Sequence, residues 1–157
     1  MSQGAATDTV RSFEFKTGSG ADTIAVGRKL AELLQPPQLL ILRGDLGTGK
    51  TTLVKGIAEA LEAADADEVT SPTFTLVHEY EGVRKGKPVK LYHLDVYRLE
   101  GERQLETLGL DELLTGDALV LVEWGEKFKS IKKKATGEIS IASAGGDARR
   151  ITVTLKD

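Results

Sequence analysis

A glycine-rich segment, 44–52, carries the most distinctive residue spacing in this chain, Gly-Asp-Leu-Gly-Thr-Gly-Lys-Thr-Thr. It matches the pattern G-x-x-x-x-G-K-[ST], in which backbone N–H groups surround phosphates. In that pattern the lysine, here Lys50, reaches the β- and γ-phosphates, and the hydroxyl of Thr51 holds Mg²⁺. An apolar run at 39–42 precedes the segment, and apolar residues at helical spacing follow it. This order of strand, loop and helix predicts binding of a nucleoside triphosphate.

The residue types of the loop suit phosphate chemistry. Glycines let the backbone wrap around a phosphate, and the start of the next helix adds partial positive charge. A plain glycine-rich turn before an amphipathic helix is the simpler alternative, but it gives the Gly-Lys-Thr-Thr sequence no packing purpose. We therefore expect the nucleotide to contact these residues of the loop and helix start: Asp45, Leu46, Gly47, Thr48, Gly49, Lys50, Thr51 and Thr52.

A carboxylate follows a second apolar run, because Glu123 comes directly after residues 118–122, Ala-Leu-Val-Leu-Val. Enzymes with this kind of loop need an acid at the end of a neighbouring strand to hold the metal or its water. We expect Glu123 to be the metal-side partner of Thr51, the alternative being an ordinary surface acid. Trp124, the only tryptophan, packs against the nucleotide or caps the core.

A third group of polar residues lies in the sequence His-Leu-Asp-Val-Tyr-Arg, 93–98. In an extended segment His93, Asp95 and Tyr97 project to one face, and the apolar residues between them to the other. Asp95 could orient the attacking water or bind the metal through water, and Arg98 could pair with a phosphate or a partner. A solvated strand face is the alternative. A weaker candidate is the hydroxyl-bearing segment Ser71-Pro72-Thr73, which could sense the γ-phosphate or be a plain turn.

The elements that must position these groups alternate between strands and helices. Helical spacing over 24–34 ends at two prolines, and the helix after the loop extends to about residue 63. Residues 74–80 and 89–94 predict a hairpin with its turn at 82–87, and 104–114 is helical with a break at Gly109. Further strands are predicted at 10–16, 39–42, 118–122, 138–142 and 151–155. We expect an α/β fold: a three-layer, P-loop NTPase-like domain with a mixed, mainly parallel central sheet.

Length and composition limit the possible classes of protein. The 157 residues suffice for one domain, 1–157, of which we expect 1–8 to be disordered. The absence of cysteine excludes disulfides and thiolate metal sites, and a net charge of −3 argues against nucleic-acid binding by charge alone. With no signal-peptide pattern and no membrane-length apolar run, a soluble cytoplasmic protein is expected.

Together, five sequence blocks resemble the TsaE (YjeE) family of bacterial ATPases. The blocks are 44–52, 71–77, 93–99, 108–112 and 122–126, of which only the first is generic. The resemblance implies an ATPase that supports threonylcarbamoyladenosine (t6A) modification of tRNA, together with the transferase TsaD and its partner TsaB. It implies Mg²⁺ on Thr51 and Glu123, phosphates on the loop, and essential roles for Asp95 and Trp124.

One departure from the resemblance is the basic stretch 127–134, which contains five lysines and two further apolar positions. A solvated lysine face is one interpretation, and a contact with tRNA phosphates inside the assembled complex is the other. The chain contains no asparagine, hence no Asn-Lys-x-Asp motif for guanine, which favours ATP over GTP. Two alternatives remain open: a small-molecule kinase, for which Arg84, Arg98 and Arg103 are too scattered to form a lid, and a binding module with incidental hydrolysis.

Overall fold

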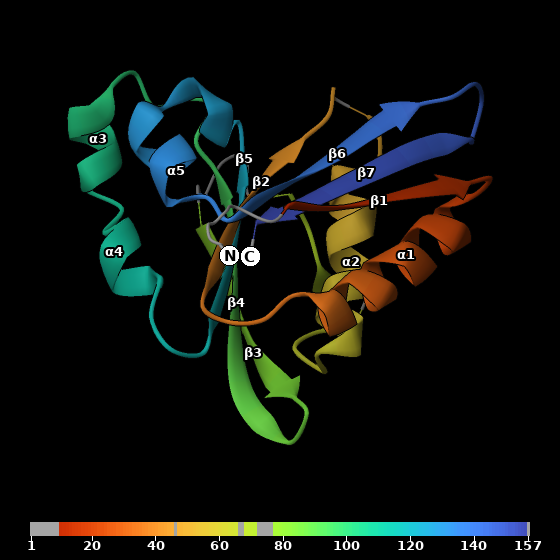
Figure 1. Ribbon diagram of the computed structural model, residues 1–157, viewed down its shortest axis with the longest axis horizontal. Helices are drawn as coiled ribbons and strands as arrows, with labels where there is room; N and C mark the ends of the chain where they lie inside the picture. Colours follow the sequence, from red (N-terminus) through yellow and green to blue (C-terminus); the bar gives the residue numbers. More distant parts are fainter. Residues whose placement is uncertain (1–9, 46, 66–67, 72–76, 157) are drawn as a thin grey trace, which may run out of the picture.

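The computed structural model of the protein describes residues 10–45, 47–65, 68–71 and 77–156. Strands and helices alternate along these residues, as an α/β fold requires (Figure 1). The elements are β1 (Val10–Thr17), α1 (Gly20–Leu33), β2 (Gln38–Arg43), α2 (Lys50–Ala60), β3 (Val77–Arg84), β4 (Lys87–Asp95), α3 (Glu102–Glu106), α4 (Leu110–Leu113), β5 (Ala118–Glu123), a 3-10 helix (Gly125–Lys127), α5 (Lys129–Lys134), β6 (Gly137–Ser143) and β7 (Arg149–Lys156).

The seven strands in the described part of the chain form one mixed sheet with the order β1-β7-β6-β2-β5-β4-β3. The four central strands, β6, β2, β5 and β4, run parallel to one another. The outer strands pair antiparallel, β3 with β4 on one side and β7 with β6 and β1 on the other. The expected mixed sheet with a largely parallel core is confirmed, and the carboxyl ends of four strands meet at one edge.

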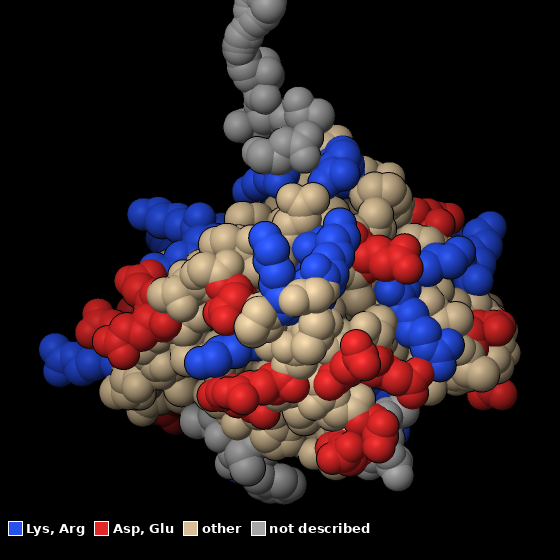
Figure 2. Space-filling model, turned by 90° about the horizontal axis from the view of Figure 1, so that it is seen from below, with Lys and Arg blue, Asp and Glu red and all other residues tan. Residues whose placement is uncertain are grey.

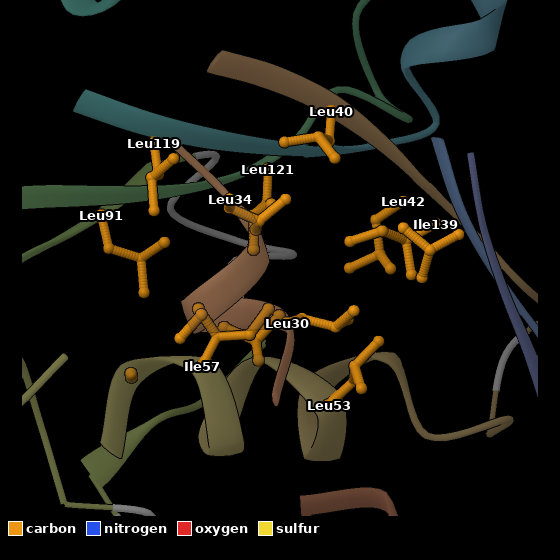
Figure 3. Packing of buried hydrophobic residues seen from close by; sticks show 14 of the residues in the cluster. Leu30, Leu34, Leu40, Leu42, Leu53, Ile57, Leu91, Leu119, Leu121 and Ile139 are labelled. Atoms are coloured by element: carbon orange, nitrogen blue, oxygen red, sulfur yellow. The ribbon is translucent and has the colours of Figure 1, made fainter. Parts of the chain in front are cut away.

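Helices cover both faces of the sheet, which gives the expected three layers. Helices α1 and α2 pack on one face, and α3, α4 and α5 lie on the other (Figure 1). The residues of β2 alternate between the layers: Leu40 and Leu42 belong to the core beneath α1 and α2, whereas Leu39 and Ile41 belong to the other core. Figure 3 shows the first core, where Leu30 and residues of α2 converge on the sheet. A central strand buried on both faces explains why its sequence is continuously apolar.

Helices α1 and α2 touch backbone to backbone through two glycines. A Cβ atom added to Gly27 would lie 2.3 Å from the carbonyl oxygen of Leu53, and one added to Gly56 would lie 2.0 Å from that of Ile24. Neither helix can accept even a methyl group at this crossing without moving. The position of α2, and of the loop that precedes it, is therefore fixed by α1.

Two expectations about local structure are corrected. The hairpin turn is not 82–87, because β3 continues to Arg84 and the turn lies at Lys85 and Gly86, both with positive φ. Gly82 is a strand residue, where a Cβ would meet the carbonyl oxygen of Leu61 at 2.2 Å. Helix α2 ends at Ala60 rather than near residue 63.

Several other expectations fall where the structure gives no test. The predicted disorder of 1–8 and the first part of the predicted strand at 74–80 lie outside the described residues. That the whole chain, 1–157, is one domain stays a prediction.

Within the described ranges, no helix is both long enough and apolar enough to cross a membrane. Acidic and basic side chains are interspersed on the face seen in Figure 2.

We predict that Gly27→Ala lowers the free energy of unfolding by about 2 kcal/mol or more, since overpacking costs about 1–3 kcal/mol and the neighbour is backbone. Urea denaturation followed by circular dichroism measures the effect. Gly20→Ala in the same helix is the control, because a Cβ there meets nothing within 4 Å. Equal stability of the two variants would contradict the close crossing of the helices.

Candidate functional site

The predicted functional groups meet at the carboxyl edge of the parallel strands. The glycine loop follows β2, Glu123 ends β5, and Asp95 ends β4. The strands are neighbours in the order β2-β5-β4, and their register pairs Leu42 with Glu123 and Glu123 with Asp95. In open α/β sheets ligands bind outside this edge of the strands.

A cavity of about 340 Å³ lies at this edge. It brings together residues of the glycine loop, the start of α2, and the ends of β4 and β5. Its lining residues are Gly47, Gly49, Lys50, Thr51, Thr52, Ser71, Asp95, Glu123 and Trp124. Most of the residues predicted to bind nucleotide and metal therefore share one space.

Two described residues of the predicted set, Asp45 and Thr48, do not line this cavity. Thr48 is buried and supports the loop from within, because its Oγ1 donates to the carbonyl oxygen of Asp45 at 2.7 Å. Asp45 itself is exposed, and Leu46 lies outside the described residues. The turn depends on Gly47 and Gly49, whose φ angles of 80° and 107° are strained for residues with a Cβ.

Lys50, Glu123 and His93 form a continuous polar chain beneath the cavity. Lys50 Nζ lies 3.2 Å from Glu123 Oε1, and His93 Nε2 lies 2.6 Å from Glu123 Oε2. Their exposed fractions are 8% for Lys50, 4% for Glu123 and 0% for His93. His93 Nδ1 has no hydrogen-bond partner among the described residues, so its Nε2–H contact with Glu123 is the polar anchor of the ring. Glu123 is therefore not an ordinary surface acid.

The Glu123 carboxyl is held in its charged form. Burial by itself raises the pKa of a carboxyl group, but the His93 hydrogen bond and the nearby His93 and Lys50 outweigh it and lower the pKa of Glu123. A carboxylate with one oxygen toward the helix start and the other toward His93 has a fixed orientation. It can attract a cation or a metal-bound water into the cavity.

Asp95 is also buried, with 6% of its surface exposed, so the solvated-face interpretation is wrong for His93 and Asp95. Its Oδ1 accepts a hydrogen bond from the backbone N–H of Tyr97 at 2.9 Å, which orients the carboxyl group at the end of the strand. Tyr97 lies beyond the strand and is 56% exposed. Arg98, next to it, is exposed and is not among the cavity-lining residues.

Trp124 has an unusual backbone conformation directly after the strand that ends at Glu123. Its φ of 66° is rare for a bulky residue and needs support from its surroundings. The indole ring receives that support from Lys50, whose Nζ lies 5.2 Å from the ring centroid, and from Tyr97, whose ring lies at 4.9 Å. The strained turn places the indole ring beside Lys50 of the glycine loop.

Two sequence candidates, the segment 71–73 and the lysine stretch 127–134, are placed only in part at this site or lie away from it. Of the segment 71–73, Ser71 lines the cavity, whereas Pro72 and Thr73 lie outside the described residues. The lysine stretch 127–134 contains the last residue of the 3-10 helix and all of α5, a helix that the sequence analysis does not predict. Its buried residues Phe128 and Ile131 pack on the sheet, and most of its lysines face outward.

A second hollow, of about 370 Å³, lies between α3, α4 and α5. Carboxylates dominate its lining, and no residue of the glycine loop reaches it. We therefore place the candidate site at the glycine-loop cavity, where a lysine, hydroxyls and two oriented carboxylates converge.

The contact between His93 and Glu123 was not anticipated from the sequence. The alternation of 93–97 places His93 on the face of Asp95 but says nothing about which strand lies beside it. Predicting this contact requires knowing that β4 pairs with β5. In that pairing His93 is opposite Leu121 and therefore diagonal to Glu123.

The fold and the glycine loop define an α/β protein of the P-loop type. A family model described as threonylcarbamoyl adenosine biosynthesis protein TsaE matches residues 17–151. The chain belongs to the TsaE family, which has a role in t6A modification of tRNA.

Similar proteins support this membership over nearly the whole chain. The TsaE protein of Bacillus subtilis is 40% identical over 146 residues, covering 92% of this chain and 87% of the relative. That of Treponema pallidum is 37% identical over 135 residues, covering 86% and 95%. The crystal structure of Bacillus subtilis YdiB matches with a TM-score of 0.66 and 35% identity, over 95% of this chain and 88% of that one.

We predict that Glu123→Gln lowers the free energy of unfolding at pH 7 by about 1–3 kcal/mol, because fully buried His93 loses its charged acceptor. The folded-state pKa of Glu123 lies below its ordinary value of 4.5, so this stabilisation is present above that pH and is lost as pH falls through the lowered pKa. Urea denaturation of both proteins between pH 7 and pH 3 measures the difference, which should shrink below about pH 4.5.

The control is Glu138→Gln, because Glu138 forms a half-exposed surface pair with Arg43. Surface pairs contribute little, so the change at pH 7 should stay within about 1 kcal/mol. A stability difference for Glu123→Gln that is independent of pH would contradict the charged, paired state of this carboxyl group.

Proposed function

We propose that this protein binds ATP with Mg²⁺ in the glycine-loop cavity and hydrolyses it to ADP and phosphate in support of t6A modification. The observation that carries the proposal is the meeting of Lys50, Thr51, Asp95 and Glu123 in one cavity with the loop glycines. Phosphoryl transfer needs little from a protein beyond positioning and charge stabilisation, and these residue types supply both.

The loop and Lys50 are assigned to the phosphates. Lys50 begins α2, so its ammonium group and the partial positive charge of an 11-residue helix act at the same place. The buried pair with Glu123 and the Trp124 ring hold the ammonium group at the cavity wall. Lys50 thereby offsets negative charge that develops between the β- and γ-phosphates.

The oxygen groups of the cavity suit Mg²⁺. This ion prefers hard oxygen ligands and usually keeps several waters, with one or two protein groups and the substrate phosphates completing its shell. Thr51 and Glu123 would hold it, directly or through water. Within the described ranges, no group of three or more His, Cys, Asp or Glu side chains is arranged so that it could hold a metal ion. When bound, the ion would neutralise phosphate charge.

Asp95 is assigned to the attacking water. It lines the same cavity as Lys50 and Glu123, is buried, and has one carboxyl oxygen fixed by the Tyr97 N–H. An oriented carboxylate can accept a proton from water or hold that water in line. Glu123 and Asp95 thus take different roles, one toward the metal and one toward the nucleophile.

The biological context follows from the family. The relatives are described as tRNA threonylcarbamoyladenosine biosynthesis proteins, and we extend that role to this chain. Its partners would be a TsaD-like transferase and a TsaB-like subunit, with tRNA contacted through the complex in the cytoplasm. The lysines on the outer side of α5 remain a prediction for a tRNA contact in that complex.

Nucleotide binding gives the first test of this function. ATP with Mg²⁺ at about 100 times its Kd stabilises the folded state by about 2.7 kcal/mol, which raises Tm by about 5–10 °C. GTP should raise it much less, because the chain contains no asparagine for a guanine motif. Lys50→Ala should abolish the ATP effect, whereas Lys55→Ala, in the same helix but outside the cavity lining, should keep it.

Thermal unfolding with each nucleotide gives these shifts directly. Equal shifts with ATP and GTP would refute the preference for adenine. Retention of ATP binding by the Lys50→Ala variant would refute the assignment of the loop.

Hydrolysis separates the two carboxylates. Asp95→Ala should bind ATP nearly normally but hydrolyse it at least about tenfold more slowly, since lost general-base help typically costs 10²–10⁴-fold. Glu123→Ala should instead raise the Mg²⁺ concentration needed for nucleotide binding. Phosphate release and binding titrations at several Mg²⁺ concentrations measure both effects.

Asp117→Ala is the matched control, because Asp117 lies before β5 at the opposite edge of the sheet. It should change neither hydrolysis nor Mg²⁺ dependence. Similar binding defects for Asp95→Ala and Glu123→Ala would mean that both carboxylates serve the metal.

A further inference from the structure

The glycine loop leans on the hairpin formed by β6 and β7. Strand β6 runs parallel to β2, so its carboxyl end lies beside the end of β2, where the loop begins. Ile141 of β6 packs against the loop: a Cβ on Gly44 would lie 2.8 Å from the Ile141 carbonyl oxygen, and one on Gly49 would lie 3.4 Å from Ile141 Cδ1. The hairpin thus forms a wall behind the phosphate-binding segment.

Arg149, the first residue of β7, joins that wall to the loop by hydrogen bonds. Its Nε donates to the carbonyl oxygen of Thr48 at 2.7 Å. Its Nη1 donates to the carbonyl oxygens of Gly146 at 2.7 Å and Ala148 at 2.8 Å, in the hairpin turn. One half-buried guanidinium group therefore connects the turn of the hairpin with the centre of the loop, across 101 positions of sequence.

The contact has a consequence for the donors of the loop. A trans peptide group is planar, so its C=O and N–H point in opposite directions. Because Arg149 holds the Thr48 carbonyl oxygen, the N–H of Gly49 in the same peptide group is turned away from Arg149. Gly49 lines the cavity, and backbone N–H groups are what a glycine loop offers to phosphates.

We propose that Arg149 is a positioning residue, which presets the glycine loop for phosphate by holding the Thr48–Gly49 peptide group in one orientation. This inference rests on the proposed nucleotide binding and deepens it. Within the loop, Thr48 N–H also donates to the Asp45 carbonyl oxygen at 3.2 Å, a bond that the anchored peptide helps to keep. A loop that is already ordered loses less conformational entropy when it binds its ligand.

Arginine suits this role for two reasons. Its planar group carries five donors in fixed directions, so it can reach carbonyl oxygens of two segments at once, which the single ammonium group of lysine does less well. Its charge is permanent and lies behind the loop, where it adds to the attraction for phosphates.

The test compares Arg149→Ala, Arg149→Lys and Arg150→Ala in the full chain. Arg150 is the matched control, because it is the next residue of the same strand, is exposed, and points to the other face of the sheet. Fluorescence of Trp124, the single tryptophan and part of the cavity lining, reports binding of ATP with Mg²⁺. We expect Kd to rise about tenfold for Arg149→Ala, by less for Arg149→Lys, and less than twofold for Arg150→Ala.

A second readout separates positioning from general stability. Without nucleotide, amide hydrogen exchange followed by NMR should be faster at Thr48, whose N–H donates to the Asp45 carbonyl oxygen, in Arg149→Ala, while amides of β5 keep their protection. A Kd and exchange rates equal to those of Arg150→Ala would overturn the proposal, as would a loss of protection spread evenly over the sheet. Failure of the parent protein to bind ATP would instead refute the proposed function.

Discussion

The buried pair of Lys50 and Glu123, backed by His93, is the interaction around which the site is organised. Each member comes from a different element: the start of α2, the end of β5 and β4, where His93 lies two positions before the end of the strand. Removing two charges from water is costly, and the cost is offset only when partners are close and well oriented. The strand order β2-β5-β4 provides that closeness, because it places the loop next to Glu123 and His93 diagonally across from it. Because Lys50 and Glu123 are buried and paired, their side chains have fixed positions at the cavity in the absence of a ligand.

The helices on the two faces of the sheet contribute to the site in different ways. On one face, the crossing of Gly27 and Gly56 leaves no room between α1 and α2, so the helix that begins at Lys50 is set by its backbone. On the other face, shorter helices cover the apolar side chains of β4 and β5, such as Leu94 and Val122. Trp124, with its strained backbone conformation, lies directly between the end of β5 and the 3-10 helix that follows it. Rigid packing beneath the loop and a strained aromatic turn beside it are a combination that functional sites often show.

The sequence predicts the parts of the site that are local in the chain. The glycine loop, the strand before it and the carboxylate at the end of β5 all follow from short patterns, as do the two faces of 93–96. The sequence does not predict which strands are neighbours, and for that reason it misses the contacts of His93 with Glu123 and of Arg149 with Thr48. It also misses α5, because the apolar positions Phe128 and Ile131 are too few to show a helical period among lysines. Gly82 is misread as a turn residue for a related reason: glycine there leaves space for the end of α2, a tertiary requirement with no local signature.

The bond between Arg149 and Thr48 also bears on how the protein is made. During synthesis the glycine loop leaves the ribosome about 100 residues before Arg149, and long-range contacts of this kind form slowly. Strands β4, β5 and β6 must also emerge and enter the sheet before the loop has all of its neighbours. A nascent chain that ends before β7 contains the complete glycine loop but lacks Arg149. Any ligand that favours the finished loop therefore stabilises the completed chain over its partly synthesised forms.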